Sequence, residues 1–310
     1  MGSVPVPVQH EWEEWVMATR PAWVDDRLFP FQSRFVEVDG ASVHYIDEGE
    51  GPVFVGLHGN PTWSFLYRHI VLGLKDRFRC VALDYPGFGL SVAPAGYRYT
   101  VAEHARVVEG FLAQLGLREV TLMVQDWGGP IGLWVAIRHP EWFRAFVIGN
   151  TWAWPMRGER STELFSKVLG SSVLGGLLVR RADVFVNVFM RAGIRRKRLT
   201  PAERQMYKRP HPTPASRVPV QVMPREILAA HELLAEVEQG LGRVADKPAL
   251  IVWGDKDPGF KERHRLRWER TFPNHRTVIL RGASHYIQED APEEIVAAIR
   301  DWWPGQAAGG

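Results

Sequence analysis

The stretch that decides the fold is Val124-Gln125-Asp126-Trp127-Gly128-Gly129, which ends one apolar run and precedes a helical pattern over residues 130–138. A short strand that ends in a nucleophile followed by X-Gly and a helix forms a sharp turn that holds the nucleophile above a sheet. Serine is the usual residue at that position, and here it is Asp126. Val124 replaces the first glycine of the usual pattern. The stretch therefore predicts a nucleophilic aspartate at a strand-to-helix turn.

A carboxylate nucleophile narrows the class of reaction. Asp126 needs no deprotonation, and it suits displacement at saturated carbon, which gives an alkyl ester that water then cleaves. The competing interpretation is that Asp126 only caps the following helix, where its charge also favours the helix dipole. That interpretation explains Asp126 alone and leaves the residues described below unexplained.

Strands alternate with helices on both sides of this turn. An Asp-Gly turn at residues 39–40 joins two alternating segments into a hairpin. Apolar runs typical of buried parallel strands follow at residues 53–57, 80–83, 121–124, 145–148, 249–253 and 277–280. Helical periodicity covers residues 64–74, 101–115, 130–138 and 292–302. The alternation predicts an α/β fold with a mostly parallel central sheet flanked by helices.

The alternation stops between residues 151 and 242, where helical patterns continue without a convincing strand. Residues 151–217 hold fourteen Lys/Arg and four Asp/Glu, and so carry +10, whereas the rest of the chain, with 24 basic and 31 acidic residues, carries −7. We therefore expect a core domain of residues 1–150 and 243–310, with a helical cap of residues 151–242 inserted after the sixth strand. Candidate pocket residues in this cap, which fit its own core equally well, are Val168, Leu169, Leu174, Leu177, Phe185, Val188 and Phe189.

Composition excludes several other classes of protein. The 310 residues are 45% hydrophobic and 24% charged, which is typical of a globular chain. Cys80 is the only cysteine, which excludes an internal disulfide and a multi-cysteine zinc site. A net charge of +3 argues against a chain-wide field for nucleic acid. We expect no nucleic-acid partner, no metal and no organic cofactor.

The N-terminal stretch predicts the compartment. Residues 1–20 contain three glutamates and no apolar core, so they do not resemble a signal peptide. The apolar runs are too short for a membrane span. The sequence therefore favours a cytoplasmic protein, and a homo-oligomer is compatible with it.

Two further residues fit the chemistry of Asp126. His285 follows the last apolar run, and Asp257 lies in the turn-rich loop after the run 249–253. A nucleophile, an acid and a histidine in this chain order match the triad of α/β-hydrolases. His285 would take a proton from water, while Asp257 would orient its ring and stabilise the imidazolium.

The identity of the acid has two alternatives. Asp255 lies two residues from Asp257 in the same loop, and one of the two is expected to be a turn residue. Position alone favours Asp257. The other acid position, after the strand that precedes the cap, holds Asn150, whose amide cannot carry the negative charge that stabilises an imidazolium.

The segment His58-Gly59-Asn60-Pro61-Thr62-Trp63 follows another apolar strand. The backbone N–H groups of Asn60 and Trp127 are the predicted oxyanion hole. Their side chains are neutral hydrogen-bond donors, and two such donors in an apolar pocket can bind a halide as it leaves carbon. The alternative interpretations are an ordinary Gly-Pro turn for Gly59 and Pro61 and simple core packing for Trp127.

Four stretches together resemble the haloalkane dehalogenases of the α/β-hydrolase fold. They are residues 58–68 (HGNPTWSFLYR), 84–91 (DYPGFGLS), 124–133 (VQDWGGPIGL) and 282–290 (GASHYIQED). The resemblance runs from about residue 35 to residue 302. It implies Asp126 as nucleophile, His285 as base and Asn60 with Trp127 as the halide-binding pair. A halogenated alkane would be the substrate, and an alcohol and a halide ion the products.

The family varies in the position of its acid. One branch places a glutamate where this chain has Asn150, so the resemblance implies Asp257, as in the other branches. Together with Asn60 after His-Gly and the run Asn150-Thr-Trp-Ala-Trp-Pro, this resembles the third branch of the family. Some relatives near that branch are β-lactone decarboxylases of olefin-forming pathways, which is the alternative function.

Other functions fit less well. Epoxide hydrolases need two cap tyrosines, and residues 151–242 contain only Tyr207. Fluoroacetate dehalogenases follow the nucleophile with arginines, and here the next arginine is Arg138. A β-lactone decarboxylase could use the same Asp, His and Asp. In that group the turn that holds the nucleophile resembles His-Asp-Trp-Gly-Gly, whereas this chain has Gln125 before Asp126. A non-enzymatic binding module would predict a damaged triad.

The densest basic cluster is Arg195-Arg196-Lys197-Arg198. A phosphate, membrane or nucleic-acid patch is one interpretation. A solvated helix end or a partner surface is the interpretation that the sequence favours.

Overall fold

The computed structural model describes residues 19–303, so the N-terminal stretch that lacks the features of a signal peptide lies almost wholly outside the described residues. Eight strands form one sheet in the order β1-β2-β4-β3-β5-β6-β7-β8. Their bounds are Arg34–Val38 (β1), Ala41–Glu48 (β2), Val53–Leu57 (β3), Arg79–Leu83 (β4), Val120–Asp126 (β5), Phe143–Thr151 (β6), Ala249–Gly254 (β7) and His275–Leu280 (β8). β1, β2 and β4 pair antiparallel, and every other neighbouring pair is parallel.

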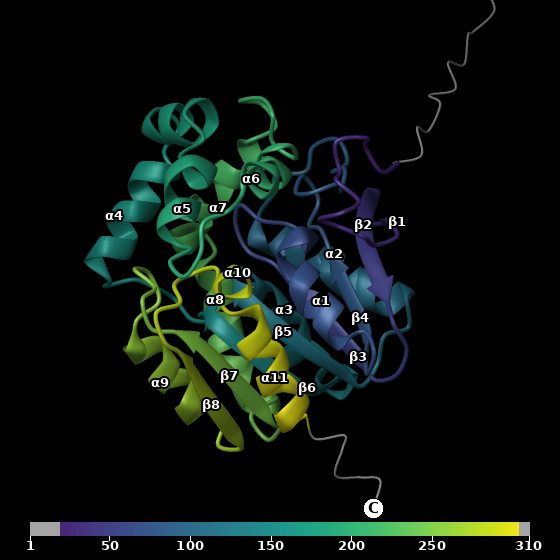
Figure 1. Cartoon of the computed structure of the whole chain (residues 1–310). Helices are drawn as coiled ribbons and strands as arrows, with labels where there is room; N and C mark the ends of the chain where they lie inside the picture. Colours follow the sequence, from purple (N-terminus) through teal and green to yellow (C-terminus); the bar gives the residue numbers. More distant parts are fainter. Residues whose placement is uncertain (1–18, 304–310) are drawn as a thin grey trace, which may run out of the picture.

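Helices cover both faces of this sheet (Figure 1). One face carries α2 (Val101–Gln114), α3 (Gly128–Arg138), α8 (His231–Gly240) and α9 (Glu262–Thr271), and the other carries α1 (Arg68–Leu74) and α11 (Pro292–Trp302). The sheet therefore has a separate apolar core on each face, which is why its central strands are apolar throughout rather than alternating. The predicted α/β-hydrolase fold is confirmed.

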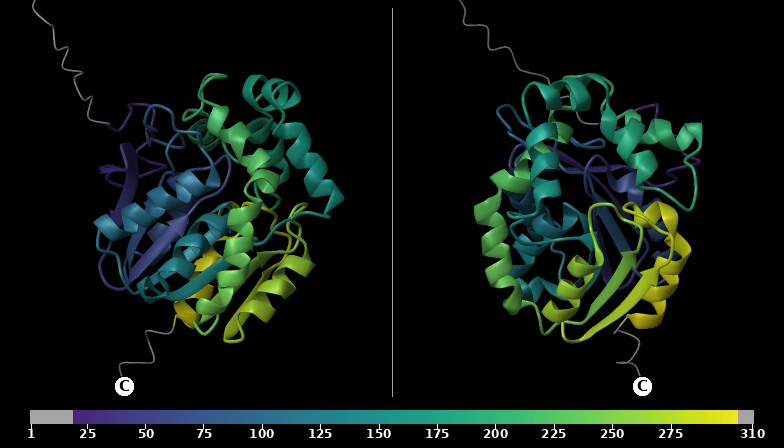
Figure 2. Two further views of the ribbon diagram at one scale, coloured as in Figure 1. Left: turned by 180° about the vertical axis from the view of Figure 1, so that it is seen from behind. Right: turned by 90° about the vertical axis from the view of Figure 1, so that its left-hand side faces the viewer.

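The residues between β6 and β7 contain helices and no strand among the described residues. They comprise α4 (Arg160–Leu169), η3 (Gly176–Arg181), η4 (Phe185–Phe189), α5 (Met190–Ala192), α6 (Pro201–Lys208), α7 (Val218–Ala229), α8 and η5 (Leu241–Arg243). Figures 1 and 2 show most of these helices stacked beyond one end of the sheet, while α8 lies alongside it and packs on α3. We call residues 151–242 the helical segment.

Within residues 19–303, no helix is both long enough and apolar enough to cross a lipid bilayer.

Candidate active site

The strand-to-helix turn after β5 places Asp126 at the sheet edge where the parallel strands end. Asp126 has a φ of +51°, a left-handed conformation that costs energy for a non-glycine residue and clusters at functional sites. A Cβ at Gly128 would lie 2.2 Å from the Leu57 carbonyl oxygen, and one at Gly129 would lie 2.0 Å from Thr151 Oγ1. Only glycine fits at these two positions, which accounts for the Gly-Gly that follows Trp127.

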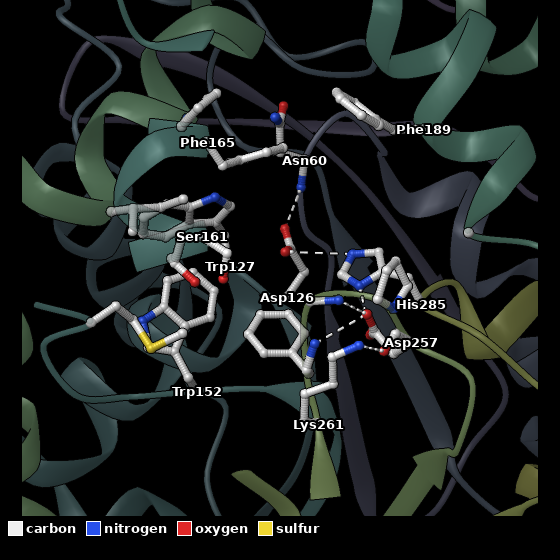
Figure 3. Close-up of a pocket in the computed structure, with 18 of the residues that line it drawn as sticks. Asn60, Asp126, Trp127, Trp152, Ser161, Phe165, Phe189, Asp257, Lys261 and His285 are labelled. Carbon is white, nitrogen blue, oxygen red and sulfur yellow. Dashed lines mark hydrogen bonds and ion pairs between the residues drawn. The ribbon is translucent and has the colours of Figure 1, made fainter. Parts of the chain in front are cut away.

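The two carboxylate oxygens of Asp126 lie in different surroundings (Figure 3). Oδ1 accepts a hydrogen bond of 2.8 Å from the backbone N–H of Asn60, one of the two predicted oxyanion donors. Oδ2 lies 3.5 Å from Nε2 of His285. The second predicted donor, the backbone N–H of Trp127, makes no hydrogen bond to the Asp126 carboxylate in the described part of the chain. One oxygen is thus held by the backbone, and the other faces the histidine.

Gly59 allows the turn after β3 to lie close to Asp126. A Cβ at Gly59 would lie 2.3 Å from both Cβ and Oδ1 of Asp126. The glycine of the His-Gly-Asn-Pro turn is therefore required by the short distance between Asn60 N–H and the carboxylate.

His285 lies between two aspartates. Its Nδ1 is 2.9 Å from Oδ2 of Asp257, which is buried after β7. The other oxygen of Asp257, Oδ1, accepts hydrogen bonds from the backbone N–H groups of Gly259 and Phe260. Burial alone would raise the pKa of Asp257, but His285 and these hydrogen bonds outweigh burial and lower it. Asp257 is therefore held as a carboxylate against the imidazole.

Asp255 contacts other residues than Asp257 does. Its Oδ1 accepts a 2.6 Å hydrogen bond from the Gly282 backbone N–H, and its Oδ2 lies near Lys256 and Arg281. Of the two aspartates that the sequence left open, only Asp257 contacts His285.

Asn150 also belongs to this site, in a role that the sequence analysis did not assign. Its Nδ2 donates to Oδ2 of Asp257 at 2.9 Å and to the Gly254 carbonyl oxygen, while its Oδ1 accepts from the Gly254 N–H. The amide therefore braces the carboxylate that contacts His285. The signal in the sequence was its position at the end of the strand next to β7.

The charge state of His285 depends on both aspartates. Burial would lower the pKa of His285, but Asp257 and Asp126 outweigh burial and raise the pKa to about 10. With both carboxylates ionised, the imidazolium is the favoured form at neutral pH. Any reaction that neutralises Asp126 removes part of this stabilisation.

Gln125 is a second residue whose contacts the sequence did not reveal. It is fully buried, and its Nε2 lies 3.2 Å from Nε2 of His285 and 3.1 Å from the His285 carbonyl oxygen. The residue before the nucleophile thus fixes the backbone of the histidine loop. A polar residue at the end of a buried strand is the signal that could have indicated it, because buried amides require partners.

The carboxylate of Asp126 faces a cavity of about 420 Å³, a volume typical of small-molecule sites. Asn60 and Trp127 both line it. The Asn60 Nδ2 donates one hydrogen to the Val220 carbonyl oxygen at 3.2 Å, which leaves its second hydrogen free of that contact. The Trp127 indole packs edge-on against Trp152, and its N–H makes no hydrogen bond within residues 19–303.

The remaining wall of the cavity is mostly apolar. It includes Trp152, Met156, Phe165, Phe185, Phe189, Pro224, Ile227 and Phe260. Of the seven pocket candidates from the helical segment, Phe185 and Phe189 line the cavity. Val168 and Leu169 pack in the apolar core instead, which is the alternative that the sequence left open, whereas Leu174, Leu177 and Val188 are exposed, so the prediction was wrong for these three. Apolar periodicity identifies a helix face without telling what covers it.

One group of residues outside the cavity has donors suited to a metal ion, namely His69, Glu203 and Glu289. Cationic side chains already neutralise its two carboxylates. Arg68 lies 3.0 Å from Glu203, and Lys197 lies 2.7 Å from Glu289. These ion pairs link α1, α6 and the loop before α6 to α10 (Ile287–Asp290), so the group fits a structural ion network.

Comparison with known proteins gives a consistent assignment. A model of the alpha/beta hydrolase fold matches residues 52–292. Haloalkane dehalogenase 2 of Mycobacterium tuberculosis is 44% identical over 89% of this chain and 96% of its own length. A cis-3-alkyl-4-alkyloxetan-2-one decarboxylase of Shewanella oneidensis is 33% identical over 89% of each chain.

Solved structures agree with the sequence comparison. The haloalkane dehalogenase DbeA from Bradyrhizobium elkani superposes with a TM-score of 0.82 at 25% identity, over 90% of this chain and all of that one. A putative ancestral haloalkane dehalogenase gives 0.80 at 28% identity, over 89% of this chain and 99% of that one. With this similarity over nearly the whole described fold, the chain belongs to the haloalkane dehalogenases of the alpha/beta hydrolase fold.

Proposed function

We propose that this protein hydrolyses haloalkanes to an alcohol and a halide ion through an alkyl ester on Asp126. The observation that carries the proposal is the split environment of the Asp126 carboxylate at the base of an apolar cavity. Oδ1 is bound by the Asn60 N–H, and Oδ2 lies beside His285 and receives no backbone donor from the part of the chain that the structure describes. The high similarity to haloalkane dehalogenase 2 supports the same assignment.

In the first step, Oδ2 attacks the halogen-bearing carbon from the side opposite the halogen. The new O–C bond forms as the carbon–halogen bond breaks, and the halide leaves with the bonding electrons. The indole N–H of Trp127 and the second amide hydrogen of Asn60 are the proposed donors to the halide, because both residues line the cavity. A dry apolar wall strengthens such donors, since little water competes for the ion.

In the second step, water attacks the carbonyl carbon of the ester. Alkylation has removed the charge of Asp126, so the pKa of His285 falls and its neutral form can take the proton from water. Asp257 stabilises the resulting imidazolium through Nδ1. The Asn60 N–H stabilises the oxyanion on Oδ1. The intermediate then releases the alcohol, which takes the proton held by His285, and leaves Asp126 as a carboxylic acid, whose remaining proton passes to solvent and restores the carboxylate.

We also propose that residues 151–242 act as a cap, which supplies the cavity wall through α4, η4 and α7, and that core residues 1–150 and 243–310 carry the triad. Tyr207 of this segment is buried and donates to Glu289 rather than lining the cavity. That placement gives no support to an epoxide hydrolase, whose mechanism requires tyrosine donors from the cap.

The second candidate function is decarboxylation of a β-lactone, which the 33% identical decarboxylase favours. The deciding experiment measures bromide release from short and medium bromoalkanes beside turnover of a cis-3,4-dialkyl β-lactone. Bromide release by the wild type, together with an inactive Asp126→Ala variant, supports the dehalogenase reaction. Lactone turnover without bromide release would replace it with the decarboxylase, and bromide release by Asp126→Ala would refute the nucleophile.

A further inference from the structure

The outer surface of the helical segment concentrates exposed apolar side chains. Nine large apolar residues among the described ones are more than about a third exposed, and six of them fall within residues 164–188. Val173 is 77% exposed, Leu164 63% and Leu177 56%, and Leu174 and Val188 are each 52% exposed. Scattered single apolar residues on a surface are ordinary, but a concentrated group indicates a binding surface.

These residues belong to one continuous layer. α4 and η3 pack against each other and both pack on α7. Phe165 of α4 contacts Phe185 and Phe189 of η4, with ring centroids 6.3 and 5.6 Å apart. Figures 1 and 2 show α4 and the helical turns that follow it on the outer side of the helical segment, away from the sheet. We call the exposed side of α4, η3 and η4 the outer face.

Cationic side chains accompany the apolar ones on these elements, at α-helical spacing on α4. On α4, Leu164 lies four residues after Arg160 and three before Lys167, and all three are exposed. Residues three and four apart lie on the same side of a helix. The outer side of α4 therefore presents one apolar side chain between two cations.

The two following elements also carry a cationic side chain a few residues after an exposed apolar one. Val173 and Leu177 are joined by one helical turn through the Leu177 N–H to Val173 carbonyl hydrogen bond, and Arg181 follows four residues later. Val188 of η4 precedes the exposed Arg191 by three residues. Apolar groups with long cationic side chains beside them are typical of surfaces that lie in the interface of a bilayer, because the apolar groups enter the acyl region while the cations reach the phosphates.

The acidic residues of this region do not cancel its charge. Residues 157–198 contain ten Lys/Arg and three Asp/Glu. Glu159 pairs with Arg263 outside this region, Glu163 pairs with Lys167, and Asp183 is buried near Arg217. Most of these cationic side chains therefore have no acidic partner close by among residues 19–303, and the outer face attracts an anionic surface.

The cluster Arg195–Arg198 is not the main source of this attraction. The backbone N–H groups of Arg195 and Arg196 bind Asp290, and Arg196 pairs with Glu294. Lys197 pairs with Glu203 and Glu289. Much of this cluster attaches the helical segment to α10 and α11, so the cations that belong to the outer face are Arg160, Lys167, Arg181 and Arg191.

We propose that the outer face binds an anionic lipid bilayer. A second copy of the chain fits it less well, because a symmetric contact would bring two strongly basic faces together. Nucleic acid fits less well, because its phosphates offer nothing to the exposed Val and Leu side chains. Phe165, which follows Leu164 on α4, lines the cavity, so a bilayer bound on the outer face of α4 lies beside the wall of the active site.

The experiment is sedimentation of the full chain with vesicles of phosphatidylcholine alone and of phosphatidylcholine with an equal amount of phosphatidylglycerol. We expect binding to the anionic vesicles, weakened in 0.5 M salt and at least tenfold weaker to the neutral ones. The variant Val173→Ser/Leu174→Ser/Leu177→Ser should lose at least tenfold in affinity. Its circular dichroism melt and its activity on a water-soluble substrate should equal those of the wild type, because none of the three lines the cavity.

A matched control removes one valine and two leucines elsewhere on the surface, as the outer-face variant does. Leu72, Val92 and Leu266 are 42%, 56% and 39% exposed and lie outside the helical segment. Their triple serine variant should bind the vesicles like the wild type. The charge variant Arg160→Gln/Arg181→Gln/Arg191→Gln should lose about fivefold per residue on anionic vesicles at low salt.

Three results would overturn the proposal. The first is a wild-type chain that stays in the supernatant with anionic vesicles. The second is an equal loss of binding in the outer-face variant and its matched control. The third is an oligomer that the wild type forms in analytical ultracentrifugation and the outer-face variant does not form. The outer face would then be an interface between copies of the chain.

Discussion

The coupling between Asp126 and His285 can be tested with Asp126→Asn, which removes the carboxylate charge and keeps nearly the same shape, as the alkyl ester would. In the wild type, Asp126 Oδ2 lies 3.5 Å from His285 Nε2. A unit charge at that distance, with an effective dielectric constant of about 20, contributes about 4.7 kcal/mol, or about 3.5 pKa units. Because the charge is shared by two oxygens, we expect a fall of about 3 units.

The pKa of His285 should therefore fall from about 10 to about 7. The sign follows from the charge, since an ionised neighbour stabilises the imidazolium and a neutral one does not. Hydrolysis of the ester needs the neutral imidazole, so its rate should rise with pH through about 7 and then level off. The first step needs only the carboxylate and should not share that dependence.

The assay is a pH titration of ¹⁵N-histidine-labelled protein by long-range ¹H–¹⁵N correlation, with His285 among eleven histidines assigned through His285→Gln. Asp255→Asn is the matched control, because Asp255 contacts the Gly282 N–H rather than His285. A pKa in Asp126→Asn within half a unit of the wild-type value would refute the coupling. An equal shift in Asp255→Asn would refute it as well, because the effect would then be a general change in charge.

Three further predictions test other parts of the site. His285→Ala should release about one halide per site and then stop, with the alkyl group found on Asp126 by mass spectrometry; continuing turnover would contradict the role of His285. Trp127→Phe should weaken bromide binding by about ten- to a hundredfold, measured by fluorescence quenching, and an unchanged affinity would exclude its N–H as a donor. Gly59→Ala should lower activity by about a hundredfold, because its Cβ would meet Asp126, whereas Gly242→Ala, with nothing within 4 Å, should retain activity.

The pattern of strands and helices in the sequence was sufficient to predict the fold and the edge at which the site lies. The carboxyl ends of parallel strands meet at one edge of a sheet, so residues after β3, β5, β7 and β8 had to converge there. The sequence could not predict contacts that depend on side-chain direction. The amide of Asn60 reaches Val220, 160 positions away, and no local pattern records that hydrogen bond.

The exposed apolar residues of the helical segment illustrate the same limit. Leu174 and Leu177 follow the spacing of a helix that buries one side, and the expectation was burial either against the cavity or in the core of the helical segment. In the structure α7 covers the inner side of η3, so these leucines point outward. Periodicity gives the side of a helix that is apolar, whereas the position of its neighbours determines whether that side is covered.

The position of Asn150 explains how the acid of this site can come from either of two strands. β6 and β7 are neighbours in register, with Gly149 opposite Val252, so the last residues of β6 and the loop after β7 reach the same space beside His285. A carboxylate at Asn150 or at Asp257 could therefore contact Nδ1, but two charged carboxylates there would repel each other. In this chain Asp257 supplies the charge, and Asn150, which cannot, donates a hydrogen bond to the oxygen that contacts the imidazole. The amide at the unused position thus stabilises the ionised form of its neighbour, which is the form that the proposed hydrolysis step requires.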